Sequence, residues 1–334
     1  MKKRIAKLVS LLIVSMVIIT GCSSSNKSSI INESTSTANG EVFRIGISQL
    51  AEHPALDDAR RGFEDGLKEL GVNAEIDYQN AQGDIPTSLT IAQKFAKDQM
   101  DLIYAIATPA AQSAKQATRD IPILFSAVTD PVKAEIVQDW ENVGGNVTGT
   151  SDKAPVETQL KMFKEIDPSI ETIGILYNTN EANSEVQIEE VKALAPNEGL
   201  EIVTVGVNNI NDLPQAIDSL FKKVDALYCL TDNMIASSVE LVTKKLNDYK
   251  MVSVSAEESQ VGGGILITNG LSYYELGKQT AKMAKEILVD GKDISSIPVG
   301  LAEKTVTTVN EKTLKALGLD ENLQIFKDAI KVGN

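Results

Sequence analysis

The chain repeats one order of apolar and polar segments, and this repeat limits the possible folds more than any other feature. The string Arg-Ile-Gly-Ile at residues 44–47 is echoed by Thr-Ile-Gly-Ile at 172–175, and Asp-Leu-Ile-Tyr at 101–104 by Asp-Ala-Leu-Tyr at 225–228. Apolar, β-rich runs that alternate with helical patterns are typical of a parallel, doubly wound sheet. Two copies therefore predict two similar α/β lobes. Helices are expected over 56–70 and 184–194, and further strands over 73–78, 121–127, 201–207 and 250–256.

The segment after Gly270 does not begin a third copy. Residues 273–289 have a helical pattern, 304–309 a strand pattern and 311–317 a second helical pattern. These elements are best used to complete the two lobes, which requires the chain to cross between lobes at three places, near 146–152, 268–272 and 297–301. We therefore expect one lobe from 41–148 plus 270–299 and another from 149–269 plus 300–334. The rival arrangement is two independent domains in series.

The first residues have the pattern of an export signal. A basic head that contains Lys2 and Arg4 precedes an apolar run over 8–19, which ends in Ile-Thr-Gly-Cys at 19–22. This order is typical of a secretory signal peptide, and the tetrapeptide resembles a bacterial lipobox, which implies a diacylated Cys22 as the first mature residue. The alternative is an ordinary signal peptide with a chance cysteine. We expect residues 1–21 to be the signal peptide and the polar stretch 22–40 to be a flexible linker.

Charge and cysteine content exclude several classes of partner. The chain has 46 acidic and 32 basic residues, and four of the basic ones belong to the expected signal peptide. So acidic a chain is a poor candidate for binding nucleic acid or an anionic lipid surface. Once Cys22 is lipidated, Cys229 alone remains, which leaves no intrachain disulfide and no cysteine metal cluster.

Catalytic motifs are scarce. His53 is the only histidine, so any Ser-His-Asp or Cys-His set would need it, and a histidine metal cluster is impossible. Abundant carboxylates leave a glycosidase-like pair open, although aromatic residues make up only 4% of the chain. We expect a binding protein rather than an enzyme, with no catalytic residue, cofactor or metal.

Open α/β sheets bind ligands at the carboxyl ends of their strands. In the first half, His53, Thr108 and Asp130 each precede a proline, a pattern that predicts three helix N-termini facing an anion. Every one of these residues could equally be a plain helix cap, and His53 could be a cap or a ligand contact.

The matching loops of the second half, at 178–184, 231–233 and 257–259, are more acidic and suit a cation. Together the two halves favour a zwitterion such as an amino acid. No arginine follows Arg119, so we expect hydroxyls, with Thr108 and Thr129 as candidates, and helix N-terminal amides to hold a carboxylate. A buried ammonium needs a carboxylate partner, for which Asp232 is the first choice and Glu52, Glu181 and Asp130 are the reserves.

At these loops the chain resembles the ABC-transporter substrate-binding lipoproteins of the tryptophan and tyrosine type, a branch of the type I periplasmic binding proteins. The strings that carry the resemblance lie at residues 45–49, 52–56, 80–84, 105–112, 127–131, 146–152, 177–184 and 231–233. One departure is the run Gly-Ile-Leu-Ile-Thr-Asn-Gly at 264–270, which is bulkier than the small-residue run of that family.

The resemblance implies two Rossmann-like lobes with parallel sheets joined by three hinge crossovers, and capture of an aromatic or other hydrophobic L-amino acid. It carries the ligand site to Gln49, Glu52, His53, Thr108, Ala127, Val128, Thr129, Asp130, Asn178, Glu181, Asn183, Ser184, Thr231, Asp232 and Asn233.

The leading functional hypothesis is a monomeric transport receptor outside the cytoplasm, anchored to the cell membrane by lipid alone. It would deliver its amino acid to an ABC permease and the ATPase of that permease. A second hypothesis is a sensory or adhesive surface lipoprotein on the same fold. An extracytoplasmic carboxylate enzyme is the third, and turnover of a substrate would distinguish it.

Overall fold

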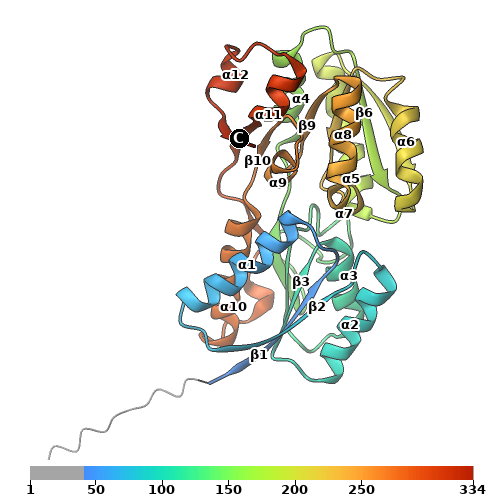
Figure 1. Ribbon diagram of the computed structural model, residues 1–334. Coiled ribbons are helices and arrows are strands. Elements are labelled where there is room, and N and C mark those ends of the chain that lie inside the picture. The colour runs from blue at the N-terminus through green and yellow to red at the C-terminus, as the bar shows by residue number, and fades with distance from the viewer. Residues whose placement is uncertain (1–40, 334) are drawn as a thin grey trace, which may run out of the picture. The chain divides into compact units, whose positions relative to one another are not determined.

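The computed structural model describes residues 41–333, so the predicted signal peptide, the linker and Cys22 lie outside the described range. Within it the chain builds two α/β lobes, each on its own sheet (Figure 1). The predicted two-lobe architecture is confirmed.

The first lobe has a six-stranded sheet in the order β11-β5-β4-β3-β1-β2. All of its strand pairs are parallel. Its strands are β1 (Phe43–Gln49), β2 (Ala74–Asn80), β3 (Leu102–Ile106), β4 (Ile123–Ser126), β5 (Val147–Ser151) and β11 (Gly300–Leu301). Its helices are α1 (Pro54–Glu69), α2 (Ile85–Lys97), α3 (Thr108–Ala117) and α10 (Tyr273–Leu288), with the short η3 (Ile294–Ser296).

The second lobe has a seven-stranded sheet in the order β13-β12-β10-β9-β8-β6-β7. Its strands are β6 (Thr172–Asn178), β7 (Glu201–Val207), β8 (Ala226–Cys229), β9 (Val252–Ser255), β10 (Ile267–Gly270), β12 (Val306–Asn310) and β13 (Ile330–Val332). Its helices are α4 (Val156–Ile166), α5 (Ala182–Leu194), α6 (Leu213–Leu220), α7 (Asn233–Ser237), α8 (Val239–Tyr249), α9 (Glu258–Gly262), α11 (Glu311–Leu317) and α12 (Gln324–Lys327), with the short η1 (Ala195–Glu198) and η2 (Ile210–Asp212).

Two details of the sheets differ from the prediction. Strand β12 pairs antiparallel with β10, because the chain enters the second lobe for the last time from the opposite direction. Strand β5 continues to Ser151 and β11 covers Gly300–Leu301, both in the first sheet. The crossovers therefore fall at 152–155, 271–272 and 302–305, the first and the third a few residues later than the predicted boundaries.

Helix α10 returns from the second lobe to pack against α1 (Figure 1). The two backbones approach at a pair of glycines. A Cβ on Gly62 would lie 2.0 Å from the Tyr274 carbonyl oxygen, and a Cβ on Gly277 would lie 2.1 Å from that of Ala59. Only glycine allows so close a contact, and this contact fixes the second crossover to the first lobe.

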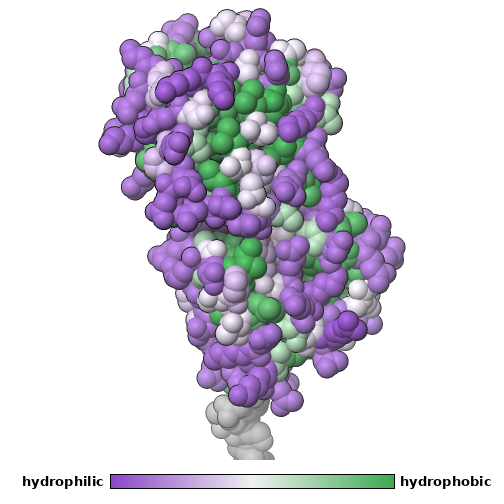
Figure 2. All heavy atoms as spheres, turned by 90° about the vertical axis from the view of Figure 1, so that its right-hand side faces the viewer, coloured by the Kyte–Doolittle hydropathy of each residue, from purple (hydrophilic) through white to green (hydrophobic). Residues whose placement is uncertain are grey.

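Each lobe has its own apolar interior. All five residues of β3 are buried, as expected for a central parallel strand with helices on both faces. The interior of the second lobe is divided into two clusters, one around Phe163 and Tyr228 and the other around Leu220 and Leu227. On the face in Figure 2, hydrophilic residues surround the apolar ones that gather in the middle of each lobe.

Candidate ligand-binding cleft

The carboxyl ends of the strands of both sheets meet at a cleft between the lobes. Nε2 of His53, just before α1, lies 3.2 Å from Oδ1 of Asn233 at the start of α7. The hydroxyls of Thr129, after β4, and Thr231, after β8, are 3.2 Å apart. Lys133 and Glu189 add an ion pair across the cleft at 3.1 Å, although both are well exposed, so this pair contributes little. Predicted site residues from opposite lobes are thus in direct contact.

Two alanines of the first lobe hold an uncommon backbone conformation at this cleft. Ala107, after β3, has φ 87°, and Ala127, after β4, has φ 59°. A positive φ costs a residue with a Cβ free energy, and such positions cluster at ligand clamps. The next residue, Thr108, is buried and its hydroxyl has no hydrogen-bond partner among the described residues. The strained loops after β3 and β4 are therefore the part of the first lobe shaped for a ligand.

One hydrogen-bond network joins the predicted residues of the second lobe, and Glu181 lies at its centre. The carboxylate of Glu181 accepts bonds from the side chains of Asn178, Asn183 and Asn233 and from the backbone N–H of Asn233 and Met234. Glu181 is only 2% exposed. Its oxygens are therefore saturated by donors from two segments, the one that joins β6 to α5 and the start of α7.

Asp232 is the second carboxylate of this network and is fully buried. Its Oδ1 accepts from the N–H of Ile235 at 3.0 Å, which caps α7. Its Oδ2 accepts from the N–H of Asn178 at 2.6 Å and from the hydroxyl of Ser184 at 2.7 Å. Both oxygens of Asp232 are thus engaged by donors of the protein itself.

Burial raises the pKa of several carboxyl groups at the cleft. Desolvation raises the pKa of Asp232 well above its ordinary value, and the nearby charge of Glu181 raises it further. Desolvation also raises the pKa of Glu257 to about 7, partly offset by hydrogen bonds from Ser259 and Gln260. The pKa of Asp152 is raised by desolvation too, against the lowering effects of the Tyr273 and Thr129 hydroxyls. Burial thus disfavours the charged form of these carboxyls, and a cation beside them would lower their pKa.

The hydrogen bonds also determine which nitrogen of His53 carries the proton. Asn233 must turn its Nδ2 toward the Glu181 carboxylate, which can only accept, so its Oδ1 faces His53. His53 then donates from Nε2. Desolvation lowers the pKa of His53 and keeps the ring neutral, so Nδ1 is a bare acceptor.

Two of the cavities between the lobes share Asn233 in their linings. The outer cavity has a volume of about 400 Å³, and its apolar lining includes Leu50, Ile85, Ile210 and Met234. Four predicted residues belong to its polar lining, namely Glu52, Asn178, Glu181 and Asn233.

The inner cavity has a volume of about 10 Å³ and lies toward the crossovers. Its lining includes the predicted residues His53, Ala127, Thr231, Asp232 and Asn233. Asp152, Glu257, Gln260 and Tyr273 also line it.

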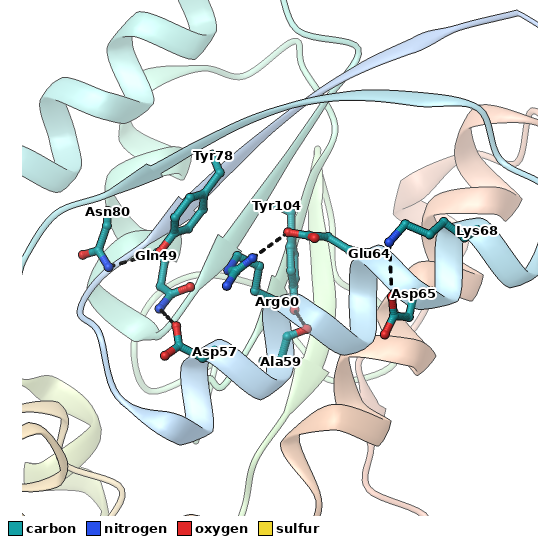
Figure 3. Close-up of polar contacts among 10 residues, drawn as sticks. All are labelled: Gln49, Asp57, Ala59, Arg60, Glu64, Asp65, Lys68, Tyr78, Asn80 and Tyr104. Atoms are coloured by element: carbon teal, nitrogen blue, oxygen red, sulfur yellow. Dashed lines mark hydrogen bonds and ion pairs between the residues drawn. The ribbon is translucent and has the colours of Figure 1, made fainter.

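Five predicted residues of the first lobe lie outside the linings of both cavities, although two of them, Thr129 and Asp130, line a third cavity of about 280 Å³ beside α5. Gln49 donates from Nε2 to Oδ1 of Asp57 and to the Ala51 carbonyl, each at 2.8 Å, and so ties β1 to α1 (Figure 3). Val128 is buried, and its carbonyl accepts from the N–H of Asp152. Thr108 directly follows Ala107, and Thr129 lies two residues after Ala127, so both belong to the loops with a positive φ.

The predicted helix N-terminus after Asp130 is wrong. Residues 131–135 form a turn, and Asp130 accepts from the N–H groups of Val132 and Lys133. Glu135 has φ 57°, which ends the turn before a helix can grow. Of the three predicted helix N-termini at this edge of the first lobe, those of α1 and α3 are present.

Sequence reasoning missed the polar residues beside the crossovers. The Tyr273 hydroxyl donates to Oδ2 of Asp152 at 2.6 Å and so links the first two crossovers. Nε2 of Gln187 donates to the Thr231 hydroxyl and reaches Oγ1 of Thr129 at 3.5 Å. Gln187 is a polar residue on α5, and the apolar periodicity of a helix does not mark such a residue as part of a site.

Neither a metal centre nor a membrane span is found in residues 41–333. No group of three or more side chains of the types that bind metals is close enough to hold an ion there. In the same range, no helix combines the length and the apolar character that crossing a membrane requires.

The model of the family described as ABC transporter substrate binding protein matches residues 44–333. The chain belongs to this family, which agrees with its two lobes and three crossovers. The predicted type I binding-protein fold is confirmed.

Individual relatives narrow the comparison. A tyrosine-binding protein of Clostridioides difficile is 42% identical over 323 residues, which cover 96% of this chain and 93% of that protein. A Streptococcus pneumoniae domain solved in complex with L-Trp has a TM-score of 0.84 at 34% identity, covering 87% of this chain and 100% of that one. The ligand-free, open structure of a Clostridium difficile substrate-binding protein with adhesive properties has a TM-score of 0.67 at 44% identity, covering 87% and 99%.

Proposed function

We propose that this chain is an extracytoplasmic receptor that captures an aromatic or other hydrophobic L-amino acid between its lobes and delivers it to an ABC permease. The observation that carries the proposal is the cleft, where strained loops of one lobe face an acidic network of the other. A zwitterion suits both kinds of surface, and an amino acid carries both charges.

The relatives support the same ligand class. One of them binds tyrosine and another was solved with L-Trp. The backbone is closer to the L-Trp complex than to the open, ligand-free protein, although the open protein is more similar in sequence. This difference supports a closed arrangement of the lobes here, as after ligand capture.

The size of the outer cavity suits an aromatic side chain. Its volume of about 400 Å³ lies within the usual range for small-molecule sites. Leu50 and Ile85 come from the first lobe and Ile210 and Met234 from the second, so an apolar ligand would be covered from both sides. Only a ligand that contacts both lobes can shift the molecule toward closure.

In this proposal the predicted site residues act as two groups. The hydroxyls of Thr108 and Thr129 and the amides of their loops hold the ligand carboxylate. Asn178, Glu181, Asn183, Ser184, Thr231, Asp232 and Asn233 supply the polar wall of the second lobe. The proposal is binding without chemistry on the ligand, because the family is one of substrate-binding proteins.

Calorimetry on the purified chain tests the ligand class. We expect micromolar or tighter binding of L-tyrosine, L-tryptophan or L-phenylalanine, with the ligand recovered unchanged. No heat with any proteinogenic amino acid, together with binding of a sugar, would contradict the proposal.

We further propose that Cys22 carries the lipid anchor. The expected result for Cys22→Ala is release of the protein from the membrane fraction with unchanged amino-acid affinity, because the tether is separate from the lobes. A variant that stays on the membrane after a high-salt wash would rule out the lipid anchor.

An adhesive surface role is the second candidate, favoured by the 44% identical substrate-binding protein with adhesive properties. Deleting the gene distinguishes the two roles. Loss of radiolabelled tyrosine uptake with unchanged attachment to a surface supports transport, and the opposite pair of results supports adhesion.

A further inference from the structure

The inner cavity contains three buried acceptor atoms that no described residue satisfies. They are Oδ1 of Asp152, Nδ1 of His53 and Oε1 of Gln260. The three residues are 3%, 7% and 2% exposed. A buried acceptor without a donor is unfavourable, so three of them around one cavity favour a ligand group that donates hydrogen bonds there.

In each of the three residues, the other polar atom of the side chain already has a hydrogen-bond partner. The Tyr273 hydroxyl donates to Oδ2 of Asp152, which leaves Oδ1. Nε2 of Gln260 donates to the Leu230 carbonyl at 2.9 Å, which leaves Oε1. Nε2 of His53 donates to Asn233, which leaves Nδ1.

Two more carboxylates line the inner cavity, but their oxygens are occupied. Asp232 accepts from three donors of the protein. Glu257 caps α9 and accepts from the N–H and hydroxyl of Ser259 and from the N–H of Gln260. Asp152 therefore offers the free carboxylate oxygen of this cavity within the described chain.

We propose that the inner cavity is the subsite for the ligand's ammonium group, with Asp152, His53 and Gln260 as its three acceptors. The inference rests on the proposed amino-acid function and names a carboxylate other than Asp232 as the ion-pair partner. An ammonium group carries three N–H donors and no acceptor, which matches three bare acceptors. A volume of about 10 Å³ accommodates one group of the size of a water molecule or an ammonium.

The position of the three acceptors links occupancy to closure. His53 belongs to the first lobe, Gln260 to the second, and Asp152 to the first crossover, where Tyr273 ties it to the beginning of α10. A single ammonium would satisfy all three only when the lobes are together. The ligand's positive charge thus acts directly on the hinge.

A ligand and variant cycle tests the inference on the full chain purified in detergent. The probes are L-tyrosine and 3-(4-hydroxyphenyl)propionate, which keeps the phenol and the carboxylate but lacks the ammonium. Asp152→Asn removes the charge with little change in shape. Asp120→Asn changes an exposed carboxylate between α3 and β4 and is the matched control. Asp232→Asn tests the competing assignment, in which Asp232 pairs with the ammonium.

We expect Asp152→Asn to weaken L-tyrosine binding by roughly 30-fold or more, the usual effect of breaking a buried charge pair. Binding of the deaminated probe should change by less than about threefold, well under the 1.4 kcal/mol that corresponds to tenfold. Asp120→Asn should leave both affinities unchanged, and Asp232→Asn should affect both probes alike. Equal losses for both probes with Asp152→Asn would overturn the inference.

A crystal structure of the wild-type chain with L-tyrosine serves if Asp152→Asn does not fold. An ammonium nitrogen within hydrogen-bonding distance of Asp152 Oδ1 supports the inference. A nitrogen placed against Asp232, Glu181 or Glu52 overturns it while the proposed function stands. A wild-type chain that binds no amino acid would contradict both this inference and the proposed function.

Discussion

Glu257 shows how a single buried carboxylate makes the free energy of unfolding depend on pH. Its folded-state pKa is raised to about 7 from an ordinary value of 4.5, mainly because burial disfavours the charge. A group with a raised folded-state pKa stabilises the fold fully below its unfolded pKa, and this contribution is lost as the pH rises through the folded value. Glu257 should therefore lower stability progressively between about pH 4.5 and pH 7.

Glu257→Gln removes this titration and keeps the size of the side chain. We expect the melting temperature of the variant, measured without ligand by circular dichroism, to rise relative to wild type as the pH increases from 5 to 8. Other titrating groups cancel in the difference. A difference that stays constant over this range would contradict the raised pKa.

The residues of the site were only partly predictable from the sequence. His53, Thr129, Thr231 and Asn233 follow strands at the cleft edge, so the position of the strand ends was enough to find them. Asp152 also directly follows a strand, β5, but the sequence analysis assigned it to a crossover and not to the site. Gln260 lies inside α9 and gains a role only through tertiary contacts. The positive φ of Ala107 and Ala127 has no sequence signal either, since alanine disfavours it.

At the scale of elements, Asp232 joins three segments of the second lobe. It caps α7, and it also binds the N–H of Asn178 at the end of β6 and the hydroxyl of Ser184 on α5. Asp232→Ala would leave three buried donors without an acceptor, each costing about 1–3 kcal/mol. We expect the free energy of unfolding without ligand to fall by about 3 kcal/mol or more in urea titrations.

The matched control is Asp84→Ala, at the N-cap of α2. Asp84 is exposed and accepts from the N–H and hydroxyl of Thr87 alone, so its loss should cost about 1 kcal/mol. Equal effects of the two variants would mean that Asp232 acts only as a helix cap.

Elements with a regular pattern were predictable, and those that depend on a turn were not. The helix Glu311–Leu317 and the strand Glu201–Val207 coincide with their predicted ranges, because apolar periodicity and flanking turn residues mark both. The predicted helix after Asp130 fails because Asp130 and Pro131 equally suit a turn, and tertiary contacts decide between the two. The antiparallel entry of β12 follows from the path of the third crossover, which local sequence does not encode.

At the scale of the molecule, three crossovers connect the lobes, and polar contacts between His53 and Asn233 and between Thr129 and Thr231 join their facing edges. These polar contacts are few, so a ligand that adds contacts to both lobes can shift the balance between open and closed forms. The account of function depends on this shift.

Small-angle X-ray scattering of residues 41–334, with and without saturating L-tyrosine, measures the shift most directly. The account predicts a smaller radius of gyration with L-tyrosine and no change with glucose, because only the amino acid provides both charges and an apolar side chain. An unchanged radius of gyration, in a sample where calorimetry shows the site to be filled with L-tyrosine, would contradict capture by closure of the lobes.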